Sequence, residues 1–181
     1  MRLLDLTIAV LDGITALIGR MVSWLVLYMV LMTFVNVVLR YMYGIANIAM
    51  IETVLYAFAI VMAATGGWTL MRNEHVRIDI LYGKKPPRTR AAIDLGGSLL
   101  LLAPVLWVIW NASYPYVQRS WRLKETSSDV AGLPYVYLLK SFLLVFVAVL
   151  AVQGVAFALR NLRILLTGRE DAPTVPAEGT R

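Results

Sequence analysis

Long apolar stretches divided by short charged segments are the main feature of this sequence. Between Arg20 and Arg40 lie nineteen residues without a charge. At about 1.5 Å per helical residue they cover about 28 Å of a hydrocarbon core that is roughly 30 Å thick. Three later stretches are similar in length. The pattern therefore predicts four transmembrane helices, at about residues 21–40, 48–71, 95–117 and 137–160.

The residues before the first span show a different periodicity. Two aspartates, Asp5 and Asp12, alternate with apolar residues that recur at helical spacing, at Leu4, Ile8, Leu11 and Ile18. This pattern predicts an N-terminal amphipathic helix that lies at the membrane interface. The aspartates, together with the lack of a small-residue cleavage site, argue against a cleaved signal peptide. We therefore expect the first span to be retained.

The segments between and after the spans are polar. A basic loop from Arg72 to Arg90 contains two lysines and two prolines and divides the chain into two helical hairpins. Within the third span, Pro104 predicts a kink unless neighbouring groups satisfy the carbonyl that it frees. We expect residues 1–168 to form one membrane domain and residues 169–181 to be a disordered cytoplasmic tail.

Composition supports an all-α integral membrane protein. Hydrophobic residues make up 60% of the chain, charged residues only 15%, and the mean hydropathy is +0.72. There is no cysteine, and His75 is the only histidine, which excludes thiolate metal sites, iron–sulfur clusters and bis-histidine haem. We expect no catalytic residue, no metal site and no cofactor.

Charge distribution predicts the orientation in the membrane. Counted between successive spans, the first, third and fifth groups of lysines and arginines sum to twelve, and the other two groups sum to five. Cytoplasmic loops carry the excess of positive charge. Both termini and the basic loop should therefore face the cytoplasm of a bacterial inner membrane. The net charge of +6 is explained by this contact with the lipid bilayer, and nucleic-acid binding is not expected.

Three charged residues close to the outer ends of the spans are the first functional candidates. Glu52 and Lys140 lie within spans, and Arg40 ends the first span. One interpretation is an ion or proton site at Glu52. The other is a salt bridge that locks helices or docks a partner, since side chains this close to a span end can reach water. The three residues could pair with one another.

Two loop segments supply the remaining candidates. In the basic loop, His75 and Asp79 flank Arg77 at helical spacing, and Asp94 could pair with Arg90. Without a neighbouring nucleophile or a second metal ligand, a structural or interface role is favoured for these residues over catalysis. In the outer loop, the polar segment that contains Glu125 could contact a soluble partner or could simply be solvated.

Glycine pairs mark places of close helix approach. They are Gly66-Gly67, Gly96-Gly97, and Gly154 beside Gln153. Small residues let transmembrane helices pack closely. The alternative, a substrate path along these glycines, is less favoured.

Several short motifs resemble the DctQ-type small subunit of tripartite ATP-independent periplasmic (TRAP) transporters. The resemblance runs from about Asn36 to Leu159. Its motifs are Asn36-Val37-Val38-Leu39-Arg40-Tyr41, Glu52, His75-Val76-Arg77-Ile78-Asp79, Pro87-Arg88 and Ile93-Asp94. Further residues resemble the subgroup labelled for mannitol, chloroaromatic compounds or 2-oxoacids: Ser120-Trp121, Glu125-Thr126-Ser127, Leu133-Pro134 and Lys140.

The resemblance implies a helper role in a larger transporter. A large DctM-like membrane subunit would carry the substrate and Na⁺ sites, and a periplasmic substrate-binding protein would deliver an organic acid. This chain would supply a static scaffold and docking surface, with the candidates Arg40, Glu52, His75, Arg77, Asp79, Asp94, Glu125 and Lys140 at interfaces or helix contacts. Many relatives have an aromatic residue and paired glutamates where this chain has Ala49-Met50-Ile51-Glu52. A role for a second carboxylate there does not carry over.

Two other function classes remain open at this stage. A membrane-anchor subunit of an enzyme or electron-transfer complex would need ligands within the spans, which the sequence does not offer. A small oligomeric channel or transporter would place Glu52 in its pore. An absorption spectrum tests the first alternative, and transport by the chain alone in liposomes tests the second.

Overall fold

The computed structural model describes residues 2–72, 82 and 85–168, and this part of the chain is helical without strands. Its helices are α1 (Arg2–Tyr43), α2 (Ile48–Arg72), α4 (Pro87–Gly97), α5 (Ala103–Leu123) and α6 (Val136–Thr167), with a π-helical turn, η1 (Ser98–Leu102), joining α4 to α5. Four helical stretches are long and apolar enough to cross a membrane: Asp5–Tyr43, Ile48–Arg72, Pro87–Leu123 and Val136–Thr167. The predicted fold class, an all-α membrane protein, is confirmed.

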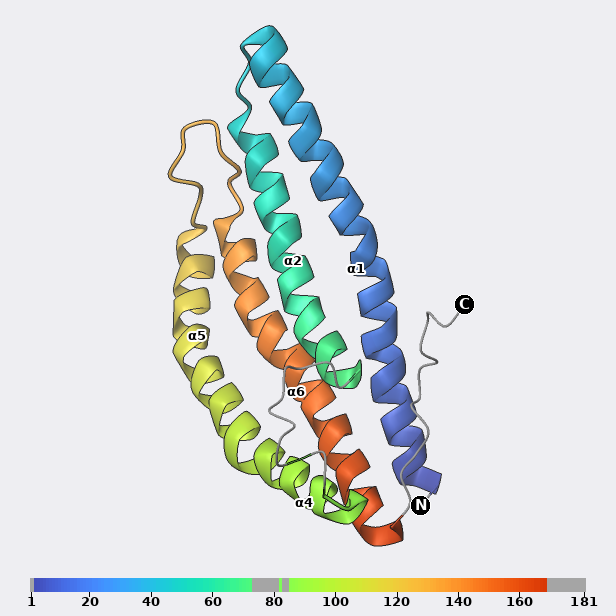
Figure 1. The fold of residues 1–181 in the computed structure, drawn as a ribbon. Helices are drawn as coiled ribbons and strands as arrows, with labels where there is room; N and C mark the ends of the chain where they lie inside the picture. The colour runs from blue at the N-terminus through green and yellow to red at the C-terminus, as the bar shows by residue number, and fades with distance from the viewer. Residues whose placement is uncertain (1, 73–81, 83–84, 169–181) are drawn as a thin grey trace, which may run out of the picture.

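The four long helices lie side by side in the order α5, α6, α2, α1 (Figure 1). Helix α6 contacts α1, α2, α4 and α5, and α2 packs between α1 and α6. Helices α1 and α5 form the two edges of the array. A smaller share of their apolar windows is buried than in α2 and α6. Much of the apolar surface of the molecule is therefore exposed on its edge helices.

The N-terminal amphipathic segment is helical, but it is not a separate helix at the interface. It forms the first part of α1, which runs without a break from Arg2 to Tyr43. Ile8, Asp12 and Thr15 are buried. Asp12 and Thr15 also make hydrogen bonds with α6. Asp12 and Thr15 therefore face the other helices, and the exposed side of the segment carries apolar residues such as Leu6 and Val10.

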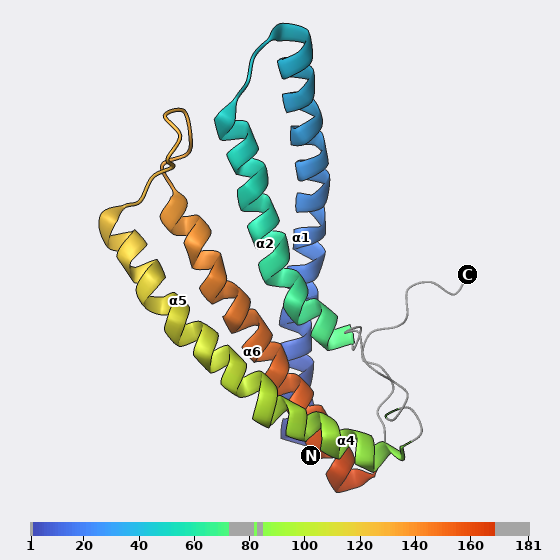
Figure 2. The ribbon, with the colours of Figure 1, turned by 60° about the vertical axis from the view of Figure 1, so that its left-hand side comes forward.

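The third long helix is irregular close to Pro104. The amide of Ala103 donates to the carbonyl of Ser98 across the wide π-helical turn, directly before a residue that has no amide hydrogen to donate. On either side of η1, helices α4 and α5 curve along α6 (Figures 1 and 2). The irregularity expected at Pro104 thus takes the form of a π-helical turn within a curved helix.

Glycines bring α2 and α6 into close contact. A Cβ atom at Gly67 would lie 2.6 Å from Val149 Cγ1, and one at Gly66 would lie 2.7 Å from the Phe146 ring. Gly154 of α6 likewise leaves room for Leu102. In contrast, nothing lies within 4 Å of a Cβ at Gly96 or Gly97. Close packing thus uses Gly66, Gly67 and Gly154, and the Gly96-Gly97 pair does not take part.

Candidate functional site

Glu52, in the first turns of α2, holds the loop that connects α5 to α6. Its Oε1 accepts a hydrogen bond from the Ser127 hydroxyl, and its Oε2 accepts one from the amide of Leu133. Both carboxylate oxygens are thereby engaged by a segment that is about 80 residues away in the sequence. The carboxylate fastens the second helical hairpin to the first at the end of the array that the charge distribution predicts to be the outer one.

The loop is shaped to receive this carboxylate. The amide of Ser127 donates to the carbonyl of Leu133 at 3.2 Å, and the amide of Gly132 donates to that of Asp129 at 2.9 Å, so the segment closes on itself. A Cβ atom at Gly132 would collide with the side chains of Ser127 and Glu52. Glycine is therefore required for the close approach.

Lys140 pairs with Glu125 at the outer end of the α5–α6 contact. Its Nζ lies 2.5 Å from Glu125 Oε2, and the Ser120 hydroxyl donates to the same oxygen at 2.6 Å. The Lys140 ammonium also lies 4.1 Å from the centre of the Tyr116 ring. Hydrogen bonds from Lys140 and Ser120 hold the pKa of the Glu125 carboxyl below its ordinary value.

Aromatic side chains extend this contact. The indole of Trp121 donates to the Ser141 hydroxyl at 2.8 Å, and its ring meets that of Tyr137 edge to face at 4.8 Å. Lys124 lies 5.0 Å from both ring centres. Lys124 has a left-handed backbone conformation, with φ of 48°, at the point where α5 ends. The cation–π contacts therefore fix the residue that terminates the helix.

A second polar cluster joins α1 to α6 at the opposite end of the array. Arg160 Nη2 donates to Asp12 Oδ1 at 2.7 Å, and Gln153 Nε2 donates to the same oxygen at 3.0 Å. The Thr15 hydroxyl donates to Gln153 Oε1 at 2.9 Å. Gln153 is fully buried and Asp12 nearly so. Arg160 also reaches the carbonyl of Met71, in the last turn of α2.

The sequence pattern did not reveal this inner cluster. It predicted a water-facing position for Asp12 in an interfacial helix, and Gln153 stood out only as a neighbour of Gly154. One signal was available, because a glutamine in the middle of an apolar span needs hydrogen-bond partners within the protein. The sequence does not indicate which residue is the partner, since 141 residues separate Gln153 from Asp12.

The suggested pairing of Arg40, Glu52 and Lys140 is wrong. Glu52 binds the outer loop and Lys140 binds Glu125. Arg40 is exposed, near the end of α1 that projects beyond α2 (Figure 1). The physical reason is that Arg40 lies in the last turn of α1, which extends past the start of α2 (Figure 1), whereas Glu52 and Lys140 make hydrogen bonds with the segment that joins α5 to α6.

The candidates in the basic loop and in α4 have different outcomes. Asp94 accepts a hydrogen bond from the Tyr82 hydroxyl at 2.6 Å. His75, Arg77 and Asp79 lie outside the residues that the structure describes, so their predicted roles remain predictions.

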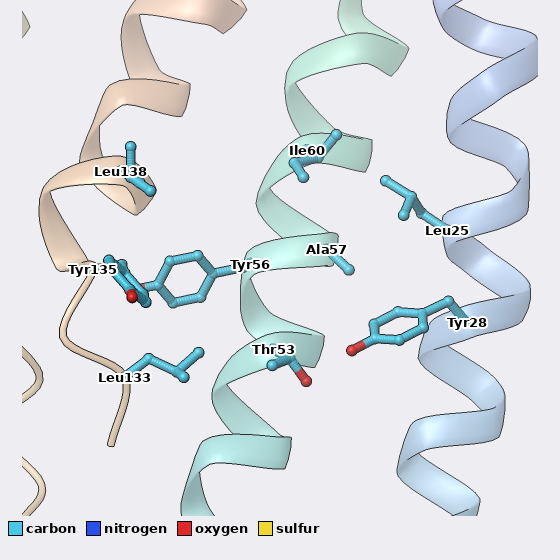
Figure 3. Close-up of a pocket in the computed structure, with 9 residues that line it drawn as sticks. All are labelled: Leu25, Tyr28, Thr53, Tyr56, Ala57, Ile60, Leu133, Tyr135 and Leu138. Carbon is cyan, nitrogen blue, oxygen red and sulfur yellow. The ribbon is translucent and has the colours of Figure 1, made fainter.

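A shallow apolar cavity of about 260 Å³ opens between α1 and α6, over the face of α2 (Figure 3). It is lined by Leu25, Tyr28, Thr53, Tyr56, Ala57, Ile60, Leu133, Tyr135 and Leu138. None of these side chains is charged. A carboxylate bound here would find hydroxyl groups at Tyr28, Thr53, Tyr56 and Tyr135 but no cation to balance its charge, so the lining does not favour an organic acid.

The site as a whole is suited to holding helices in place. In the described part of the chain there is no group of three or more His, Asp or Glu side chains that could bind a metal ion. The carboxylates that emerge from the geometry, Glu52, Glu125 and Asp12, are each occupied by donors from another helix or loop. Two contacts bring together residues that are scattered in the sequence. One contains Ser120, Glu125 and Lys140, and the other joins Ser127 and Leu133 to Glu52.

Comparison with known proteins gives one family. The sequence model described as "Tripartite ATP-independent periplasmic transporters, DctQ component" matches residues 29–164, from the last part of α1 to the last turn of α6. A relative from Vibrio cholerae, "C4-dicarboxylate TRAP transporter small permease protein DctQ", is 29% identical over 97 residues. That alignment covers 51% of this chain and 42% of the relative. No solved structure matches the chain.

Proposed function

Since this chain belongs to the DctQ family of tripartite ATP-independent periplasmic transporter components, we propose that it is the static scaffold of such a transporter. In this role it binds a large DctM-like membrane subunit, which moves the substrate. It also offers docking surface to a periplasmic substrate-binding protein. The substrate class is organic acids, carried by secondary active transport coupled to Na⁺.

The observation that carries this proposal is the engagement of the charged groups at the span ends. A coupling ion or proton needs a carboxylate that can exchange its partner during transport. Glu52 is held by a hydroxyl and a backbone amide, and Asp12 is held by Arg160 and Gln153. Such contacts favour a fixed arrangement of helices over a moving ion site.

The partner and substrate assignments rest on the family and on one relative. The name of the Vibrio cholerae relative refers to C4-dicarboxylates, which supports organic acids as the substrate class. The chain spans less than half the length of that relative. The exposed apolar surface of α1 and α5 is consistent with a chain that is covered by another membrane protein.

Co-expression with the neighbouring large membrane subunit tests the proposal. The tagged chain should recover the large subunit in a stoichiometric complex after gentle solubilisation. In liposomes, uptake of a dicarboxylate should require both membrane chains and the binding protein, and a Na⁺ gradient should drive it.

Two results would contradict the proposal. One is a chain that purifies alone under all mild conditions while the large subunit transports without it. The other is transport by this chain alone, which would support the small oligomeric channel. In that case Glu52→Gln should change ion flux, whereas the scaffold proposal expects no flux to begin with.

A further inference from the structure

The cavity between α1 and α6 exists because these two helices diverge. The inner cluster joins them through Asp12 and Arg160. They separate toward the other end of the array, where residues 124–135 connect α5 to α6 (Figures 1 and 2). We refer to that end as the loop end. Helix α2 lies between the diverging helices, with α1 on one side of it and α6 on the other (Figure 3). The cavity therefore has protein on three sides.

Hydroxyl groups and aliphatic side chains occupy opposite ends of this cavity. On α1, which runs toward the loop end, Leu25 precedes Tyr28 (Figure 3). On the chain that enters α6, which runs away from the loop end, Tyr135 precedes Leu138. The lining residues of α2, which also begins at the loop end, follow the same order: Thr53, Tyr56, Ala57 and Ile60. Apart from Leu133, the lining is thus polar toward the loop end and aliphatic farther in.

The cavity lies at the depth of one lipid leaflet. Helix α2 has 25 residues and is about 37 Å long, whereas the hydrocarbon core is roughly 30 Å thick. Thr53 is five residues and Ile60 is twelve residues from the start of α2 at Ile48. The cavity therefore extends for about 10 Å along α2, within the half of the membrane nearer the loop end. Its hydroxyl groups lie toward the headgroups, where tyrosine side chains are common.

Two tyrosine hydroxyls at the loop end of the cavity can bind a ligand. Among the described residues, the hydroxyls of Tyr28 and Tyr135 have no hydrogen-bond partner. Tyr28 extends from α1 toward α2 (Figure 3). In contrast, the Thr53 hydroxyl donates to the carbonyl of Met50 at 2.7 Å. A hydroxyl within a bilayer is costly without an acceptor, and the ester carbonyls of a phospholipid are acceptors close to this depth.

The width and polarity of the cavity favour a lipid chain over other occupants. A volume of about 260 Å³, extended over about 10 Å, is too narrow for a helix, which is about 10–12 Å across with its side chains. A group of ordered water molecules needs several polar partners for each molecule, and the inner part of the lining is aliphatic. A hydrocarbon chain with a polar group at one end matches the width, the depth and the order of the lining residues.

We propose that the cavity binds one acyl chain of a membrane phospholipid. The ester group lies beside Tyr28 and Tyr135, and the methylene chain runs along Ala57 and Ile60. Contact on three sides gives this chain more van der Waals contacts than a lipid has on a single exposed helix face, so it exchanges more slowly with the bilayer. The proposal goes beyond the transporter role and does not depend on it, because it requires only that the chain spans the membrane.

Photoreactive phosphatidylethanolamine tests this site. One probe carries a diazirine in the acyl chain next to the ester, and a second carries it at the middle of the chain. The full chain, with the large subunit wherever it co-purifies, is reconstituted in nanodiscs of phosphatidylethanolamine and phosphatidylglycerol that contain one of the probes. After illumination, mass spectrometry of the digested protein locates the labelled residues. Leu55 and Phe58, which are exposed on α2 at similar depth, are the reference positions.

The mid-chain probe should label Ile60 at least about threefold more than the reference positions Leu55 and Phe58. The probe next to the ester should shift the label toward Tyr28. Ala57 is buried, so Ala57→Phe fills the cavity and should reduce the label at Ile60 to the reference level. Equal labelling of cavity and reference positions, or the opposite order for the two probes, would overturn the proposal. A cavity without label in a folded wild-type chain would overturn it as well.

Tyr28→Phe provides a second measurement that keeps the aromatic ring and removes only the hydroxyl. The fraction of chains that retain a phospholipid after detergent washing should fall at least about twofold, as measured by native mass spectrometry. The same change at Tyr41, which is 81% exposed near the end of α1, is the matched control and should have no effect. Equal retention by Tyr28→Phe, Tyr41→Phe and the wild-type chain would contradict the placement of the ester group.

Discussion

At the scale of single residues, three carboxylates near the ends of the helices each have a partner on another helix or loop. Asp12 meets Arg160, Glu125 meets Lys140, and Glu52 meets a loop amide and a hydroxyl. A charge that leaves water must be compensated by hydrogen bonds or by an opposite charge. These contacts therefore connect helices that the sequence separates widely.

The inner ion pair should contribute more to stability than an exposed pair on the same two helices. Asp12→Ala leaves Arg160 partly buried without its carboxylate and should lower the free energy of unfolding by about 2–3 kcal/mol. Asp5→Ala removes the more exposed pair with Arg163 and should change it by less than about 1 kcal/mol. Equilibrium unfolding in mixed micelles measures both. Equal effects of the two variants would contradict the structural role given to the inner cluster.

Glu52 should control the order of the outer loop. Glu52→Ala removes the acceptor of the Leu133 amide, so that this amide should exchange with deuterium much faster than in the wild-type chain. Glu52→Gln keeps one carbonyl acceptor and should give an intermediate rate. Amide exchange in the inner half of α6 serves as the control and should be unchanged. Unchanged exchange at Leu133 in Glu52→Ala would show that the carboxylate does not hold the loop.

The Glu125–Lys140 pair should make stability dependent on acid pH. The pKa of Glu125 is lowered in the folded chain from an ordinary value of 4.5, so the folded state favours the ionised carboxylate. The stabilisation is complete above that value and is lost as the pH falls through the lower, folded-state pKa. Thermal unfolding in detergent between pH 7 and pH 3 should show this loss in the wild-type chain. The loss should be smaller in Glu125→Gln, and identical pH profiles would argue against the pair.

At the scale of helices, glycine positions decide which surfaces come together. Gly67 faces Val149, including its backbone carbonyl, whereas the surroundings of Gly96 are open. The π-helical turn before Pro104 lets α4 and α5 follow α6, and Leu102 of that turn packs where Gly154 lacks a side chain. Close contact between α2 and α6 therefore depends on a few small residues.

Two glycine substitutions with the same chemistry should have opposite effects. Gly67→Ala forces a methyl group against Val149 and should destabilise the protein by about 1–3 kcal/mol. Gly96→Ala meets no atom and should be neutral or stabilising by up to about 1 kcal/mol, because alanine favours helix. Unfolding in mixed micelles compares them. A harmless Gly67→Ala would mean that α2 and α6 can separate without cost.

At the scale of the whole molecule, the four long helices form an open array with two exposed edges. An isolated soluble protein would bury such apolar surface. Here the bilayer can cover such surface on the edge helices α1 and α5. The array thus has the form expected of one component of a larger membrane assembly.

The orientation of this array is a separate prediction. The excess of positive charge predicts that both termini face the cytoplasm. A green fluorescent protein fused after the last residue should fluoresce, and alkaline phosphatase fused after Ser128, in the outer loop, should be active in cells. Removing positive charge from the basic loop between Arg72 and Arg90 should weaken both signals. The reverse pattern, with active phosphatase at the C-terminus, would invert the assignment.

The sequence by itself determined the class of the protein. Charge-free stretches of bilayer length specify transmembrane helices, because an unpaired backbone polar group in lipid is too costly. The same periodicity located Glu52 and Lys140 at span ends. Family motifs along the chain indicated a DctQ component, which the family comparison confirms.

Only the tertiary structure decided which residues meet. Local periodicity gave Asp12 a water-facing position, yet α1 continues unbroken and turns this residue to Gln153 and Arg160. Likewise Glu52 and Lys140, which could have paired with each other, have other partners in the segment that joins α5 to α6, namely the Leu133 amide and Glu125. Periodicity reports which face of a helix is polar, whereas the identity of the partner depends on the depth and neighbours of each helix, which are set by contacts between residues far apart in the chain.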